Sequence, residues 1–166
     1  MVGSIICGVD ESASARGAAR VARGLSGKLG VSLLFVGVVD EGSADEKVNA
    51  IAARLECLTS AASDVDHGAR WLIEVGHPAD RLVAAAADAG ASMIVVGSHG
   101  ARAPLLGSIS AEVSRRAHCP VVVVPPGAED RLNSAQELPG DNNIRVERGV
   151  SNAGGLVRFG PGVQRT

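Results

Sequence analysis

The chain is poor in aromatic residues and carries no excess of positive charge. Its 166 residues include one Trp, two Phe and no Tyr, and its formal net charge at pH 7 is −2. Proteins that bind single-stranded nucleic acids combine a basic groove with several aromatic side chains on which bases stack. The composition therefore argues against nucleic acid as a partner.

Paired cysteines and long hydrophobic runs are also missing. Cys7, Cys57 and Cys119 are far apart and form no CxxC motif, which argues against a disulfide framework or a zinc site. No apolar stretch approaches the ~18 residues of a membrane span. The first residues lack the basic segment of a secretory signal. We therefore expect a cytoplasmic protein that does not associate with a membrane.

Short β-branched runs alternate with alanine-rich segments along most of the chain. This alternation predicts a single α/β domain over residues 1–126, with one doubly wound, Rossmann-like sheet of five parallel strands and helices on both faces. Strands are predicted at 4–9, 31–39, 71–75, 92–96 and 120–124, and helices at 14–28, 42–65, 78–88 and 108–117.

The remaining residues, 127–166, read as a C-terminal extension. Residues 127–142 are rich in Gly, Asp, Asn and Pro and are typical of a linker. Two short apolar segments follow, at 144–150 and 156–159, separated by the sequence SNAGG. They are compatible with a β-hairpin and equally with a flexible tail.

Polar and glycine-rich positions gather where predicted strands end. Ligands of such sheets bind beyond the carboxyl ends of the strands, where the strand order reverses. Asp10, residues 38–40 and the loop 97–108 all lie at such ends. Asp10 and Asp40 are the acids available there for Mg²⁺, although a hydrated surface role fits Asp40 better.

Motifs of enzymatic chemistry are missing from the sequence. It contains no GxxxxGK[ST] motif, and no nucleophile can be matched with a base. His67, His77 and His118 show no metal-ligand spacing, so no metal site is predicted from the protein's own residues. We therefore favour a binding protein over an enzyme, and weak ATP hydrolysis stays open as an alternative.

The loop 97–108, GSHGARAPLLGS, has the composition of an anion-binding loop. Glycine permits positive φ and close approach of backbone N–H groups to an oxyanion, and a helix N-terminus after Gly107 attracts negative charge. Two interpretations of Ser108 remain: its hydroxyl donates to a phosphate, or it caps the helix. His99 is either a phosphate donor or a solvated side chain.

Several segments in the right order resemble the universal stress protein family over residues 4–126. They are IICGVDES, GHPADRLVAAA, IVVGSHG and GSISAEVSRRAHCPVVVVPP. The family has a five-stranded parallel fold similar to that of the adenine nucleotide alpha hydrolases. Its ATP-binding members carry G-x2-G-x9-G-(S/T) after the fourth strand. Gly97, Gly100, Gly107 and Ser108 match this pattern, but six residues separate Gly100 from Gly107 where the family has nine.

The resemblance implies a stress-response module that binds ATP or another adenine nucleotide, with Mg²⁺ as a possible companion. It implies that Asp10 contacts the adenine or ribose, that the Val38 backbone contacts the adenine, and that the other site residues are Gly97, His99, Gly100, Gly107, Ser108 and Ile109. The shortened loop leaves two alternatives: a ligand with fewer phosphates, such as AMP, or a dimeric regulatory protein of the same fold that binds no nucleotide.

The last predicted strand, Pro120–Val124, is short and apolar and would lie at a sheet edge. Exposed edges of this kind pair readily with another chain. Universal stress proteins commonly dimerise through this strand, so the resemblance implies a homodimer. Two alternatives remain: the C-terminal extension folds back over this edge within one chain, or it is swapped and covers the edge of the partner.

Overall fold

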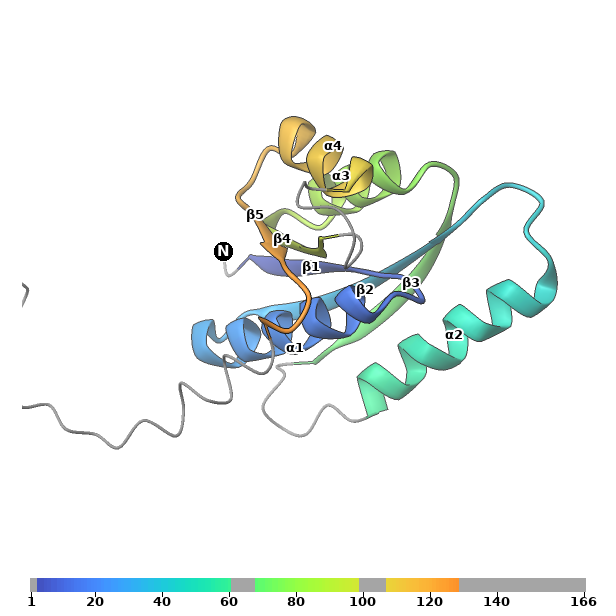
Figure 1. Cartoon of the computed structure of the whole chain (residues 1–166). Coiled ribbons are helices and arrows are strands. Elements are labelled where there is room, and N and C mark those ends of the chain that lie inside the picture. Colours follow the sequence, from blue (N-terminus) through green and yellow to red (C-terminus); the bar gives the residue numbers. More distant parts are fainter. Residues whose placement is uncertain (1–2, 61–67, 99–106, 129–166) are drawn as a thin grey trace, which may run out of the picture.

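The computed structural model describes residues 3–60, 68–98 and 107–128 (Figure 1). In these residues strands and helices alternate, as the sequence predicts, and the predicted bounds of the first strand and the third helix match the observed ones. The elements are β1 (Ser4–Val9), α1 (Ala13–Leu29), β2 (Ser32–Val39), α2 (Asp45–Ser60), β3 (Arg70–Val75), α3 (Pro78–Asp88), β4 (Ala91–Gly97), α4 (Ser108–Arg116) and β5 (Val121–Val124).

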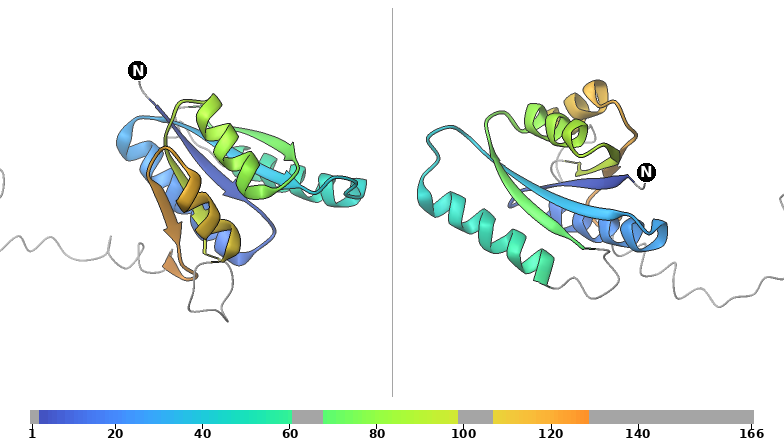
Figure 2. Two further views of the ribbon diagram at one scale, coloured as in Figure 1. Left: turned by 90° about the horizontal axis from the view of Figure 1, so that it is seen from above. Right: turned by 180° about the vertical axis from the view of Figure 1, so that it is seen from behind.

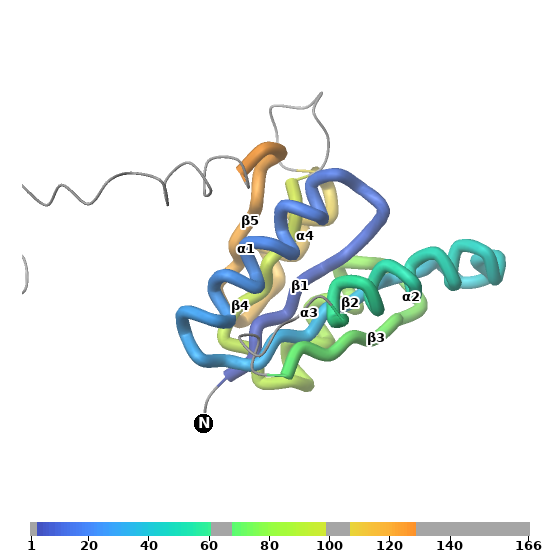
Figure 3. Tube along the Cα trace, turned by 90° about the horizontal axis from the view of Figure 1, so that it is seen from below, coloured from blue at the N-terminus to red at the C-terminus, as the bar shows by residue number. Residues whose placement is uncertain are grey.

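All five strands are parallel and lie in the order β3-β2-β1-β4-β5, which can be followed across the sheet in Figure 3. The chain runs outward from β1 to β3 and then returns to the other side of β1 to form β4 and β5. Crossovers in parallel sheets are right-handed, so connections that run in opposite directions place their helices on opposite faces. Accordingly, α1 and α2 cover one face, and α3 and α4 cover the other (Figures 1 and 2).

The central strands are buried on both faces, which explains their nearly continuous apolar sequences. Side chains alternate along β1: Ile5 and Cys7 pack toward α1 and α2, whereas Ile6 packs toward α3 and α4. Burial raises the pKa of the Cys7 thiol far above its ordinary value, so this thiol remains protonated. Cys7 therefore acts as a small apolar core residue.

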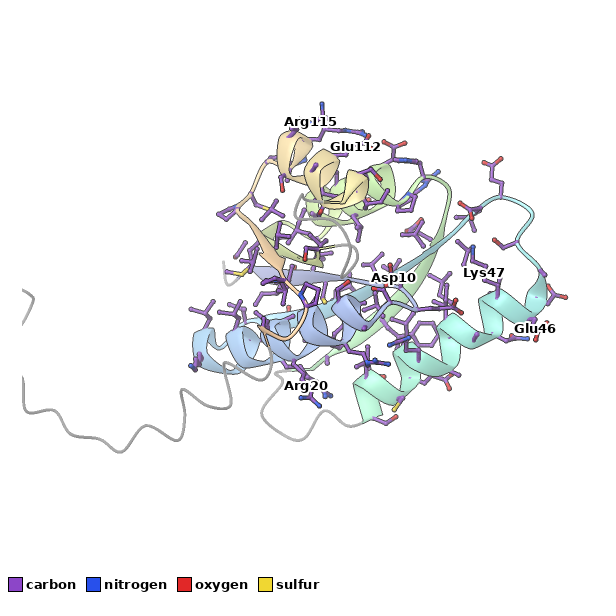
Figure 4. The ribbon with its side chains drawn as sticks, in the orientation of Figure 1. Asp10, Arg20, Glu46, Lys47, Glu112 and Arg115 are labelled. Carbon is purple, nitrogen blue, oxygen red and sulfur yellow. The ribbon has the colours of Figure 1, made fainter. Side chains whose placement is uncertain are left out.

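Helix α1 lies close to the sheet because its inner face consists of small residues. Ser12 caps its N-terminus by accepting a hydrogen bond from the Ala15 N–H, and Gly30, at φ 65°, ends it in the left-handed conformation. Arg20 projects from the outer face of the helix, away from the sheet (Figure 4). The buried residues of α1 are Ser14, Ala15, Gly17, Ala18, Ala19, Ala22 and Ser26.

Some predictions lie outside the described residues. They are the end of the predicted helix 42–65, the loop residues His99 and Gly100, and residues 129–166 of the predicted extension. The boundary between a 1–126 domain and an extension therefore stays a prediction. In the described part of the chain, no helix combines the length and the apolar character needed to cross a bilayer.

Gly37 shows how tightly α2 packs on the sheet. A Cβ atom added at Gly37 in β2 would lie 2.5 Å from Ile51 Cγ2 and 3.1 Å from Leu55 Cδ1. The Ile51 Cγ2 atom belongs to a β-branched side chain with little rotamer freedom, so the helix itself has to move to relieve this contact.

We expect Gly37→Ala to lower the free energy of unfolding by about 1–3 kcal/mol, because overpacking forces a shift of α2. Gly24→Ala is the matched control, since nothing lies within 4 Å of a Cβ atom added there. This exposed helical position should gain about 0.5–1 kcal/mol from higher helix propensity. Urea denaturation measures both changes. Equal stabilities of Gly37→Ala and the wild type would contradict the described packing of α2.

Candidate functional site

A cavity of about 120 Å³ opens at the carboxyl edge of the sheet, where the strand order reverses between β1 and β4. A single water needs roughly 10–15 Å³ of such space, so the cavity admits a larger molecule. Its lining comes from the ends of β1, β2 and β4 and from the first turns of α1, α3 and α4. This is the position at which open parallel sheets bind their ligands.

The walls of the cavity are largely apolar, with a few polar side chains among them. The apolar side chains are those of Val36, Val38, Leu82, Val96 and Ile109. Among the polar residues, Asp10 is exposed, Ser12 is half-buried, and Ser14 and Ser110 are buried. An apolar concavity with a small number of placed polar groups is typical of sites for small organic molecules.

Asp10 stabilises the turn that leads from β1 into α1. Its Oδ1 atom accepts a hydrogen bond from the Ser12 N–H at 2.8 Å, and the Ser12 hydroxyl lies 3.0 Å from that of Ser14. Ser12, not Asp10, is the helix cap. Asp10 thus stands beside the start of α1 (Figure 4), with its carboxylate oriented by the backbone and lining the cavity.

Helix α4 begins at the cavity without a side-chain cap from any described residue. Its N-cap is Gly107, at φ −58°, and Ser108 is the first helical residue, so the interpretation of Ser108 as the cap is wrong. The helix boundary lies one residue earlier than that interpretation requires. The nearby Ser110 hydroxyl donates to the Gly107 carbonyl at 3.0 Å. No described side chain therefore caps the first N–H groups of α4, which favours an anion there.

Gly97 has a packing role that the sequence did not reveal. A Cβ atom at this position would lie 2.8 Å from both the carbonyl carbon and the hydroxyl oxygen of Ser14, so glycine allows the start of α1 to approach β4. Neither Gly97 nor Gly107 is among the glycines with positive φ. Positive φ is therefore not the reason for glycine at these two positions.

The structure brings together part of the predicted site. Asp10, Val38, Gly97 and Ile109 line the cavity. Gly107 and Ser108 open α4 immediately before Ile109 but are not among the lining residues. The predicted site residues His99 and Gly100 lie outside the described residues, and their roles stay predictions.

Sequence reasoning missed Gly8, Ser14, Leu82 and Ser110, all of which line the cavity. Gly8 carried a usable signal, since a glycine inside an apolar strand often marks a close approach. A Cβ atom there would lie 3.1 Å from Leu82 Cδ1. Ser14 and Ser110 carried no such signal, because the sequence does not show whether a serine in the first turn of a helix faces a cavity.

Asp40 does not join Asp10 at the cavity. It is exposed at the end of β2, it is not among the lining residues, and its Oδ2 atom pairs with Lys47 Nζ at 3.1 Å. Figure 4 shows Lys47 near the start of α2. This arrangement supports the surface role expected for Asp40.

Comparison with known families now identifies the fold. The model of the universal stress protein family matches residues 1–125. The chain belongs to the universal stress protein family. No protein of curated function matches it significantly.

Solved structures of universal stress proteins agree with the described fold. One, in complex with cAMP, has 26% sequence identity and a TM-score of 0.62, and the match covers 75% of this chain and 98% of that one. UspA from Lactobacillus plantarum has 21% identity and a TM-score of 0.62, covering 74% and 97%. A protein from Archaeoglobus fulgidus in complex with dAMP has 24% identity and a TM-score of 0.57, covering 75% and 99%.

Proposed function

We propose that this universal stress protein binds an adenine nucleotide in the cavity between β1 and β4. The observation that carries the proposal is that Asp10, Val38, Gly97 and Ile109, four of the expected nucleotide-site residues, line one cavity. The related structure at 26% identity was solved with cAMP, which is an adenine nucleotide. The apolar walls suit the faces of a purine base, and the polar groups suit ribose and phosphate.

In this proposal the walls of the cavity contact different parts of the nucleotide. The adenine ring lies against the apolar side chains of β2 and α4, and Asp10 accepts a hydrogen bond from an amino or hydroxyl group of the ligand. The phosphate lies at the N-terminus of α4, where Gly107 and Ser108 present backbone N–H groups to the anion. Mg²⁺ accompanies the ligand only when that ligand carries more than one phosphate.

The length of the loop favours a ligand with a short phosphate chain. Six residues separate Gly100 from Gly107, and the family's ATP-binding pattern has nine. Three residues span at most about 10 Å, and a shorter loop contributes fewer N–H donors. We therefore propose AMP or cAMP as better ligands than ATP.

We expect Asp10→Ala to weaken AMP binding at least about tenfold, because a charge-assisted hydrogen bond is worth roughly 1.5–3 kcal/mol. Isothermal titration calorimetry with AMP, cAMP, ATP and GMP measures the affinities. Asp40→Ala is the matched control: it removes an exposed carboxylate from the end of the neighbouring strand, outside the cavity. It should leave the affinity unchanged, and urea denaturation verifies that both variants fold.

Two results would contradict the nucleotide proposal. An absence of heat with every adenine nucleotide at high protein concentration would leave the alternative of a regulatory protein that binds none. An equal loss of affinity in Asp10→Ala and Asp40→Ala would show that general electrostatics, and not contact with Asp10, governs binding.

We also propose that two copies of the chain associate through β5, the outermost strand beside β4. Pro120 O accepts from Ile94 N at 2.9 Å, and Val124 O accepts from Ser98 N at 2.8 Å. Backbone groups alternate in direction along a strand, so those of Val121 and Val123 point away from β4. No described strand pairs with them, so they form an edge that a second β5 strand can pair with.

Val123→Pro tests this edge, because proline removes an outward N–H without removing a bond to β4. We expect the wild type to sediment as a dimer and Val123→Pro as a monomer. Val123→Ala is the control, since it removes the same side chain but keeps the N–H, and it should remain dimeric. A monomeric wild type, or a Val123→Pro dimer as strong as that of Val123→Ala, would contradict pairing through β5.

A further inference from the structure

A cluster of ionisable side chains lies outside the nucleotide cavity, on the outer side of α3 and α4. His77 is the residue just before α3, Asp80 lies in the first turn of that helix, and Glu112 belongs to α4. Each of the three offers one potential ligand atom, and these atoms lie within 4.8 Å of one another. The two helices pack side by side on the same face of the sheet (Figure 2), and Figure 4 shows Glu112 projecting from α4.

Each of the two carboxylates has one oxygen bonded to Arg116 and the other oxygen near His77. Arg116 Nη1 donates to Asp80 Oδ1 at 2.5 Å and to Glu112 Oε1 at 2.7 Å. The other two oxygens face the imidazole of His77, with Asp80 Oδ2 3.9 Å from Nδ1 and Glu112 Oε2 3.8 Å from Nε2. These separations are too long for hydrogen bonds. Two carboxylate oxygens and an imidazole thus converge without bonding one another directly.

We propose that His77, Asp80 and Glu112 bind a divalent transition-metal ion, with zinc as the best match. One imidazole nitrogen and two carboxylate oxygens are a donor set that zinc accepts, whereas magnesium prefers oxygen alone. With bonds of about 2.0–2.2 Å, tetrahedral zinc holds its ligand atoms about 3.3 Å apart. The two carboxylate oxygens lie beside different ring nitrogens, so a rotation of the His77 side chain, which is 49% exposed, has to bring one nitrogen toward both.

Arg116 is not a metal ligand in this proposal but hydrogen-bonds to the two carboxylate ligands. Its guanidinium holds the oxygens that point away from His77, so the carboxylates are oriented in the manner of metal ligands that are themselves hydrogen-bonded.

An ion at this place would tie the first turn of α3 to α4. Pro78 follows His77, and Ser110 lies two residues before Glu112; both line the nucleotide cavity. The metal would therefore stiffen one wall of the cavity without touching its ligand. The proposal stands independently of nucleotide binding and goes beyond it.

The test titrates the full-length protein with Zn²⁺ alone, in a Cys57→Ser background that removes the exposed thiol. We expect one zinc ion per chain, and at least a tenfold weaker affinity in His77→Gln and in Glu112→Gln. His118→Gln is the matched control, because His118 is exposed beyond the end of α4 and outside the cluster. It should bind zinc as tightly as the parent. Mg²⁺ should produce no comparable heat.

X-ray absorption on the zinc-loaded parent protein keeps the test informative if a variant folds poorly. We expect nitrogen and oxygen ligands with a single imidazole and no sulfur. Sulfur ligation would overturn the proposal. So would an absence of zinc binding, or a His77→Gln variant that binds zinc as tightly as His118→Gln.

Discussion

The pairing of β1 with β4 is the constraint on which the rest of the structure depends. β1 also pairs with β2, so it stands at the point where the chain reverses its direction across the sheet. Connections leave this point toward opposite faces, and no described helix passes over the carboxyl ends of β1 and β4. The cavity therefore results from this order of strands and does not require a specialised loop.

Small residues then give the cavity its shape. Gly97 allows the first turn of α1 to approach β4, and this approach carries Ser14 into the cavity wall. Gly8 leaves room beside Leu82 on the opposite face of the sheet. The glycine that sequence reasoning assigned to phosphate binding thus has a structural reason of its own, so the loss of binding on its substitution would not by itself identify a ligand contact.

The sequence predicted the order of the elements because each apolar run and each helical period is a local signal. Pro78 marked the start of α3, and the predicted parallel sheet with helices on both faces is confirmed. Features that depend on contacts between residues far apart in the sequence could not be predicted from it. The backbone places the cap of α4 at Gly107, although serine at 108 is the better capping residue. His77 showed no metal spacing among the histidines, because its neighbour Glu112 comes from another helix and reaches it only through packing.

We propose that this universal stress protein binds its ligand in the cavity between β1 and β4. Titration of ¹⁵N-labelled protein with AMP, followed by NMR, is the decisive experiment. We expect the largest shifts at the amides of Gly8, Ser14 and Ile109, while those of α2 stay in place. Saturable binding with its largest shifts in α2, or no shifts at the cavity amides, would contradict it.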